Sequence, residues 1–145
     1  MKIIPSFIEL ETGSGLSIHD LTKSIQQQLK QSGISNGTIA VTSQHTTTAL
    51  AINEHEERLV DDIKTFFKKL IPAEDKYLHN DIHLRDCPED EPENAHSHLA
   101  AILLGSSESI AIVNGELVLG QYQSVMLYEL DGPRQRKVSL QIIGE

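Results

Sequence analysis

Histidines are the side chains of this sequence whose number and placement most suggest chemistry. The chain has seven histidines but only three tyrosines, three phenylalanines and no tryptophan. His45 interrupts a β-branched segment that otherwise has the pattern of core strands, and four others fall between positions 79 and 98. Three roles are open for such a side chain: a hydrogen-bonded structural histidine, a metal ligand or a proton carrier.

The spacing of the histidines limits which of them can share a metal ion. Zinc takes three or four imidazole, thiolate or carboxylate ligands from rigid elements that lie close in space. His96 and His98 are about 200° apart on a helix, so one turn cannot direct both to one ion. His98 shares a helix face with apolar residues and therefore points inward more readily than His96. His79 and His83 lie in an acidic loop and face one ion only if that segment is helical.

Carboxylates form a second group of candidate functional residues. Glu54 lies seven residues before Asp61 and eight before Asp62, which is about two helical turns, so we expect all three on one helix face. Such carboxylates can act as acid and base, or orient metal-bound histidines. The alternative is an acidic helix face exposed to solvent.

Two arginines follow a tight turn near the C-terminus. Arg134 and Arg136 offer rigid donor forks that suit phosphate or carboxylate. Ser107, after Gly105, can add a hydroxyl donor, and Gln123 either lines a cleft or ends a strand ladder. The alternative for the arginines is ion pairing with the many acidic groups, or a subunit interface.

Composition sets the class of protein. A length of 145 residues suits one domain, 1–145, with one hydrophobic core. A formal charge of −9 argues against a nucleic-acid partner, and the absence of a long apolar run argues against a membrane span. The single cysteine, Cys87, cannot form an intrachain disulfide, and the N-terminus lacks a signal-peptide layout. These features predict a cytoplasmic protein.

The elements that must position these residues are predicted from periodicity and turn signals. Strands are expected over 3–10, 38–43, 47–52, 109–113, 121–130 and 137–143. Helices are expected from about 18 to 30, from an Asn53 cap to Pro72, and from an Asn94 cap to residue 104. Residues 73–93 read as a long acidic loop, and Asn114-Gly115 as a hairpin turn. The pattern predicts an α+β fold with a mainly antiparallel sheet system.

Several stretches resemble the YjbQ family in both sequence and order. They are QHTTTALAINE, YLHND, NAHSHLAAILLG, GELVLGQYQSVMLYELDGPRQRKV and the terminal QIIGE, and together they span essentially the whole chain. Members are small proteins described as secondary thiamine-phosphate synthases. The resemblance implies a YjbQ-like β-sandwich of about seven strands, in the order two strands, helix, two strands, helix, three strands. It also implies a homotrimer.

The resemblance also implies roles for individual positions. It implies a divalent metal, zinc or magnesium, held by His45, His98 and, as third ligand, His83, with His79 as the alternative to His83. Catalytic roles are implied for Glu54 and Asp62, which are expected to lie close enough to assist. Binding of a phosphorylated small-molecule substrate is expected at four residues: Arg134, Arg136, Gln123 and Ser107.

Three functions follow from these expectations. The first is a transferase that joins a hydroxymethylpyrimidine diphosphate to a thiazole phosphate, as a secondary activity. The chain lacks a glycine-rich phosphate loop and a carboxylate-rich magnesium motif, which weakens a dedicated diphosphate chemistry. The second is a trimer that binds a metal or a phosphorylated metabolite without turnover. The third is a metal-dependent hydrolase whose bound water is activated by Glu54.

Overall fold

A computed structural model describes all 145 residues and contains eight strands, three α-helices and two short 3₁₀ turns. The strands are β1 (Lys2–Glu11), β2 (Gly15–Asp20), β3 (Gly37–Ser43), β4 (Thr48–Asn53), β5 (Ser107–Val113), β6 (Glu116–Leu117), β7 (Ser124–Gly132) and β8 (Gln135–Gly144). The helices are α1 (Thr22–Ser32), α2 (Glu57–Leu70) and α3 (Ala95–Leu104), and the 3₁₀ turns are η1 (Leu78–Asn80) and η2 (Ile82–Leu84).

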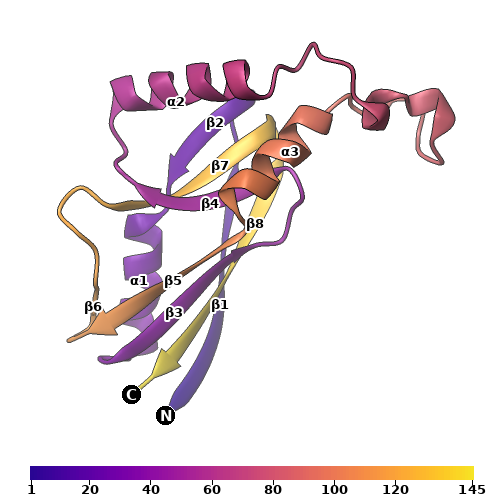
Figure 1. Cartoon of the computed structure of the whole chain (residues 1–145). Coiled ribbons are helices and arrows are strands. Elements are labelled where there is room, and N and C mark those ends of the chain that lie inside the picture. The colour runs from indigo at the N-terminus through magenta and orange to yellow at the C-terminus, as the bar shows by residue number, and fades with distance from the viewer.

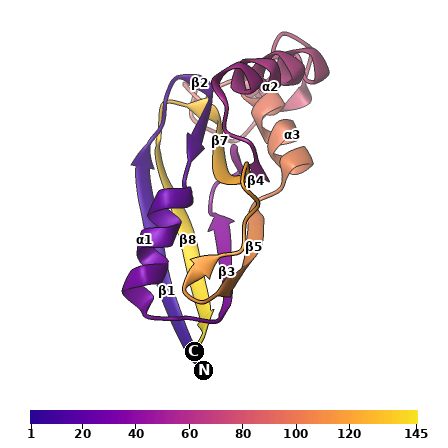
Figure 2. The ribbon, with the colours of Figure 1, turned by 90° about the vertical axis from the view of Figure 1, so that its left-hand side faces the viewer.

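The strands form two antiparallel sheets that pack face to face. One sheet has five strands in the order β1-β8-β3-β5-β6, and the other has three in the order β2-β7-β4. The three-stranded sheet and α1 cover the same face of the five-stranded sheet (Figures 1 and 2). The main hydrophobic core lies between these layers and includes Ile25 and Leu29 of α1, Ile39 of β3 and Ile142 of β8, all fully buried.

A third layer covers the other face of the three-stranded sheet. Met126 and Tyr128 of β7 point toward this layer, whereas Val125 and Leu127 point into the main core. α2 and α3 lie over this face (Figure 1). Their side chains cover it, among them Phe67 of α2. β7 is therefore apolar on both faces because it is the central strand of the middle layer.

The predicted α+β fold with antiparallel sheets is confirmed, and most predicted strands lie within two or three residues of their expected bounds. The hairpin at Asn114-Gly115 is confirmed, with φ values of 51° and 78° that this turn type requires. Residues 73–93 form the expected loop, with η1 and η2 inside it. The eighth strand, β6, is only two residues long. No helix of the chain is long and apolar enough to cross a membrane.

Two predicted helix starts are wrong. Residues 15–20 form strand β2, paired with β7 so that Ile18 lies opposite Tyr128, and α1 begins only at Thr22. Asp20, the last residue of β2, accepts from the Thr22 N–H at 2.9 Å. α2 begins at Glu57, where Glu56 rather than Asn53 is the N-cap and accepts from two backbone N–H groups.

Candidate functional site

The connection between β3 and β4 carries His45 from one sheet to the other. β3 ends at Ser43 in the five-stranded sheet, and β4 begins at Thr48 in the three-stranded sheet. α3 contacts β4, and between them lies a cavity of about 570 Å³ that we call the imidazole cleft. Its lining residues are Ser43, Gln44, His45, Thr46, Thr48, His98, Ala101, Ile102, Gly105 and Ser106. His45 and His98 thus meet at one polar hollow.

The imidazole of His45 completes a strand ladder. The β3–β8 pairing runs as far as Ser43 opposite Val138, so the next residue of β8, Lys137, pairs with Glu9 of β1 but has no partner in β3. The backbone N–H of Lys137 donates to Nε2 of His45 at 2.9 Å. The bond requires a lone pair on Nε2, so the neutral ring carries its proton on Nδ1. His45 therefore has a structural role, and its Nδ1–H is the donor left for other partners.

Burial is the main influence on the protonation of His45. The pKa of His45 lies below its usual range, first because the ring is partly buried and second because the Arg136 guanidinium is near. The Glu129 carboxylate acts in the opposite direction but does not outweigh these effects. At neutral pH the ring is neutral.

His98 extends from α3 into the imidazole cleft and is backed by a second histidine. Its ring packs edge to face on that of His79, with centroids 4.7 Å apart and planes inclined by 76°. The pKa of His98 lies below its usual range, chiefly through burial and then through His79; Asp131 opposes the shift. A neutral imidazole at this position can accept a proton or bind a metal through a ring nitrogen.

Hydroxyl groups line the rest of the imidazole cleft. The Ser43 and Thr48 hydroxyls are hydrogen-bonded to each other, and the backbone N–H of His45 donates to Ser43 Oγ at 3.3 Å. The Ser43 N–H donates to the Ser106 carbonyl at 2.8 Å, which joins the end of β3 to the second residue after α3. Thr46 and Ser106 add hydroxyls at the exposed rim. Ser106 was expected, with Ser107, to add a hydroxyl donor, whereas Ser43, Thr46 and Thr48 were not predicted as site residues, although the run Thr46–Thr48 beside a histidine was a signal.

His83 is not brought to the imidazole cleft. It is exposed on η2 and lines another cavity with Arg85 and Cys87, whereas its neighbour His79 contacts His98. No group of three or more histidine, cysteine, aspartate or glutamate side chains in the chain is arranged to hold a metal ion. The predicted set of His45, His83 and His98 is therefore not assembled within one chain.

Glu54 is separated from His45 along the chain by β4: His45 lies before the first residue of this strand, and Glu54 follows its last. Six strand residues span about 20 Å. Glu54 also precedes α2, so it does not share a helix face with the exposed Asp62. The expected shared helix face is wrong because α2 starts at Glu57, later than the helical spacing assumed. Their catalytic roles stay predictions.

The predicted phosphate-binding residues lie outside the lining of the imidazole cleft. Arg134 is exposed and forms an ion pair with Asp131 at 2.9 Å. Gln123 accepts from the Gly120 N–H at 2.7 Å and closes the exposed turn before β7. Ser107 is exposed at the start of β5, next to the cleft residue Ser106. Phosphate binding by these residues stays a prediction.

Arg136 is buried in an ion pair that joins the two sheets. Its Nε and Nη2 each donate to a carboxylate oxygen of Glu129 at 2.7 Å, and Nη2 also donates to Thr47 at 2.8 Å. Glu129 is fully buried and also accepts from Thr12 at 2.6 Å and from the Asp131 N–H at 2.9 Å. Burial by itself raises the pKa of Glu129, but the bonds from Arg136 and Thr12 outweigh it and lower the pKa below its usual range.

This ion pair fixes the connection that carries His45, because Thr47 belongs to that connection. Sequence reasoning missed Glu129, although a carboxylate inside the apolar run of residues 125–130 was a visible signal. A buried charge needs a partner, and an arginine seven residues later supplies it. The arrangement as a whole offers a rigid, neutral imidazole pair with hydroxyl donors, which suits binding and proton transfer on a small polar molecule.

Comparisons of this chain with family models and with known proteins point to the same family. A family model described as UPF0047 protein YjbQ-like matches residues 6–145. The chain is 37% identical over 145 residues to a UPF0047 protein of Methanothermobacter thermautotrophicus, which covers 100% of this chain and 95% of that protein. It is 36% identical over 131 residues to a UPF0047 protein of Archaeoglobus fulgidus, with coverage of 90% and 94%.

Solved structures agree with this result. A YbjQ-like protein of unknown function from Sulfolobus solfataricus P2 has a TM-score of 0.89 and 34% identity, over 99% of both chains. An uncharacterized yjbq/upf0047 family protein from Clostridium acetobutylicum has a TM-score of 0.85 and 34% identity, over 95% of this chain and 99% of that one. The predicted YjbQ-like fold is confirmed, and the trimer stays a prediction.

Proposed function

Since the chain belongs to the UPF0047 protein YjbQ-like family, we propose that it is an enzyme whose imidazole cleft holds a phosphorylated small molecule. The proposed activity is a transfer of the thiamine-phosphate-synthase type, as a secondary activity on a cleft that also takes other phosphorylated molecules. One observation carries this proposal: His45 and His98, distant in sequence, line one cleft together with four serine and threonine residues.

The proposed transfer needs donors for a leaving diphosphate. The bond from the pyrimidine methylene carbon to the diphosphate oxygen breaks, and a bond forms from that carbon to the thiazole nitrogen. The electron pair leaves with the diphosphate, so donors placed at its oxygens stabilise the transition state. The Nδ1–H of His45 and the hydroxyls of Thr46 and Ser106 are the donors available in the cleft. The carbonyl end of α3 at Gly105 disfavours an anion, so we expect the diphosphate at the His45 end.

We propose a divalent metal, zinc or magnesium, in the cleft only if a neighbouring subunit supplies some of its ligands. His45 uses its Nε2 for the Lys137 N–H, and His98 has His79 as its close imidazole neighbour. This set does not fit a three-ligand site within one chain, and the proposed transfer uses the hydrogen-bond donors of the cleft alone. Metal analysis of protein purified without a nickel column should give well under one equivalent per chain. A full equivalent would show that a neighbouring subunit supplies ligands.

A cytoplasmic homotrimer is the assembly that we propose. The outer face of the five-stranded sheet is uncovered and exposes Ile3, Phe7 and Val113, which are 59%, 46% and 50% accessible. Beside the imidazole cleft, α3 exposes Ile102 and Leu103. Exposed apolar side chains such as these can be covered at an interface between subunits. Light scattering should give three times the chain mass of 16.1 kDa, and a monomer at micromolar concentration would contradict the proposal.

Two alternatives use the same cleft. The protein can bind a phosphorylated metabolite without turnover, since hydrogen-bond donors alone suffice for that. It can also be a metal-dependent hydrolase, in which His98 or a neighbouring subunit's carboxylate at position 54 accepts a proton from water. Binding with no release of products under any condition would favour the first alternative. Release of inorganic phosphate without a second substrate would favour the second.

The transfer is tested with purified protein, hydroxymethylpyrimidine diphosphate and thiazole phosphate. We expect His45→Ala and His98→Gln each to reduce kcat by about 10²-fold, the usual effect of removing a positioned donor or proton acceptor. His83→Gln is the matched control, because this exposed histidine lies outside the cleft, and it should keep the full rate. Full activity in both cleft variants would remove the proposed site.

The arginine prediction has its own test. Arg134 is the exposed guanidinium of the pair, whereas Arg136 is already occupied by Glu129. If Arg134 contributes to phosphate binding, Arg134→Ala weakens the affinity for pyrophosphate, and Lys23→Ala, at an exposed position on α1, leaves it unchanged. Equal affinity in wild type and Arg134→Ala would exclude this role.

A further inference from the structure

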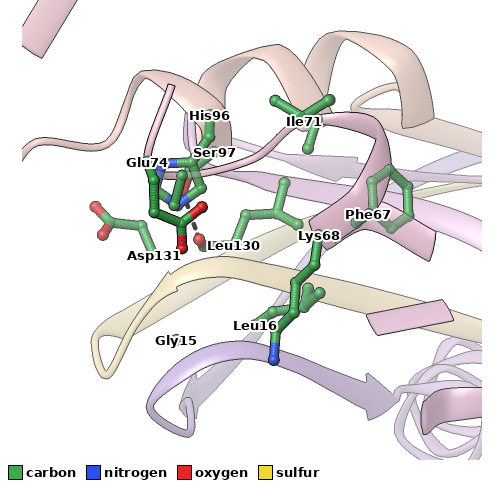
Figure 3. Close-up of a pocket in the computed structure, with 12 residues that line it drawn as sticks. Gly15, Leu16, Phe67, Lys68, Ile71, Glu74, His96, Ser97, Leu130 and Asp131 are labelled. Atoms are coloured by element: carbon green, nitrogen blue, oxygen red, sulfur yellow. Dashed lines mark hydrogen bonds between the residues drawn. The ribbon is translucent and has the colours of Figure 1, made fainter. Parts of the chain in front are cut away.

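A second cavity lies on the opposite side of α3 from the imidazole cleft. It has a volume of about 360 Å³, within the range of small-molecule sites. The end of α2, the first turns of α3, and the start of β2 beside the end of β7 enclose it (Figure 3). None of its residues lines the imidazole cleft, although His96 and His98 are only two positions apart. We call it the α2–α3 pocket.

The walls of the α2–α3 pocket are mainly apolar. Leu16, Phe67, Ile71 and Leu130 line it, and Figure 3 shows Phe67 and Ile71 together on one side of the opening. α2 has no fully buried residue, so the pocket is a gap left under the last turn of that helix. Such walls suit the body of an apolar or amphipathic ligand, which removes this surface from water.

The polar groups of the pocket are chiefly acceptors and gather at one side. Glu74 and Asp131 project there, with His96 behind them (Figure 3). Arg134 and Asn94 both donate to Oδ2 of Asp131, so its Oδ1 is still available. Nδ1 of His96 is buried and has no hydrogen-bond partner. An unpartnered buried nitrogen is uncommon and indicates a group that a ligand or water can satisfy.

Two features argue against an anionic ligand at this side of the pocket. The first N–H groups of α3 are largely occupied: Ala95 donates to Asn80 Oδ1, while Ser97 and His98 donate to the Asn94 carbonyl. The one cation that lines the pocket, Lys68, extends toward Leu16 and away from Glu74 (Figure 3). Arg134 is paired with Asp131, whereas no cation is paired with Glu74, so the acceptor side carries net negative charge.

We propose that the α2–α3 pocket is a second ligand site, which takes a small primary amine with an apolar body. The ammonium donates to Glu74 and to Oδ1 of Asp131, and the apolar body packs against Phe67 and Ile71. This site is separate from the imidazole cleft and does not depend on the proposed transfer.

The test compares three probes with one apolar body and different head groups: hexylammonium, hexanol and hexanoate. Each is titrated into full-length protein whose isoleucine and leucine methyl groups are observed by NMR. We expect saturable shifts at Ile71, Leu16 and Leu130 but not at Ile102 of the imidazole cleft, with affinity falling in the order hexylammonium, hexanol, hexanoate. No saturable shift, or shifts centred on Ile102, would overturn the site.

Variants separate the head-group contact from the apolar contact. Glu74→Gln should weaken hexylammonium about threefold to fivefold and leave hexanol unchanged, because exposed charge pairs contribute up to about this factor. Glu116→Gln removes the same charge from the exposed strand β6 and should change nothing. Ala73→Leu fills the pocket from its exposed rim and should weaken all three probes. Equal binding of hexylammonium and hexanol, or no effect of Glu74→Gln, would overturn the amine specificity.

Discussion

Removing Arg136 is expected to destabilise the protein strongly, because it leaves Glu129 buried without its counter-ion. Glu129 is 0% exposed and Arg136 is 6% exposed, and two hydrogen bonds of 2.7 Å join them. Breaking a buried ion pair on one side usually costs about 3–5 kcal/mol. Arg136→Met keeps an unbranched apolar stem, so we expect a loss of about 3–5 kcal/mol in the free energy of unfolding. In a domain of this size the melting temperature falls by about 10 °C.

The assay is urea denaturation at one fixed chain concentration, because any oligomer makes apparent stability depend on concentration. Glu129→Gln should be similarly destabilising, since it leaves the guanidinium buried without an anion. The free energy of unfolding of the double variant should fall by less than the sum of the two single losses, because the two residues interact directly. The difference should be about 1.5 kcal/mol or more. A loss below about 1 kcal/mol for Arg136→Met, or additive losses, would refute the role assigned to this pair.

The same ion pair predicts a dependence of stability on pH. The pKa of Glu129 is lowered in the folded protein, because its hydrogen bonds outweigh the effect of burial. Its contribution is therefore complete above the unfolded pKa of about 4.3 and is lost as the pH falls through the folded pKa. Glu129→Gln should flatten the stability profile in this acidic range. An unchanged slope would contradict the assigned pKa shift.

Three further predictions follow from individual residues. The pKa of His98 is lowered in the folded protein, so its contribution to stability is present above about pH 6.5 and is lost as the pH falls toward the folded pKa. His98→Gln should therefore flatten the dependence of the unfolding free energy on pH between pH 7 and 5. An unchanged slope would contradict this. Glu54→Gln should change the transfer rate by no more than about twofold, because β4 places Glu54 about 20 Å from His45; a tenfold loss in steady-state assays would instead support a site shared between subunits. Gly115→Ala should cost about 1 kcal/mol in chemical denaturation, because Gly115 has φ 78°, and unchanged stability would show that the turn relaxes.

The main elements follow directly from sequence patterns, and the exceptions have a physical reason. Residues 15–20 match a helical stripe with Leu21 and Ile25, but they also alternate, with Leu16 and Ile18 on one face. Pairing with β7 buries that face against the third layer, and this tertiary contact decides for the strand. A local pattern cannot show which strand will pair with it.

The candidate site was predictable in part. That His45 and His98 meet was predicted from the family resemblance and from their positions at element ends, and both line the imidazole cleft. Whether Glu54 lies near His45 was not predictable, since its position depends on the direction of β4. The hydrogen bond between His45 and Lys137 was not predictable either. It depends on where the β3–β8 pairing ends, and this is set by the folded structure and not by a local sequence pattern.

The most direct test is an NMR titration of the imidazole nitrogens with pyrophosphate, in wild type and in His83→Gln. If the cleft is the binding site, the signals of His45 and His98 shift together with one dissociation constant, and the His83→Gln variant gives the same constant. Signals of His45 and His98 that stay unchanged at saturating pyrophosphate, or that respond with different constants, would contradict a shared cleft.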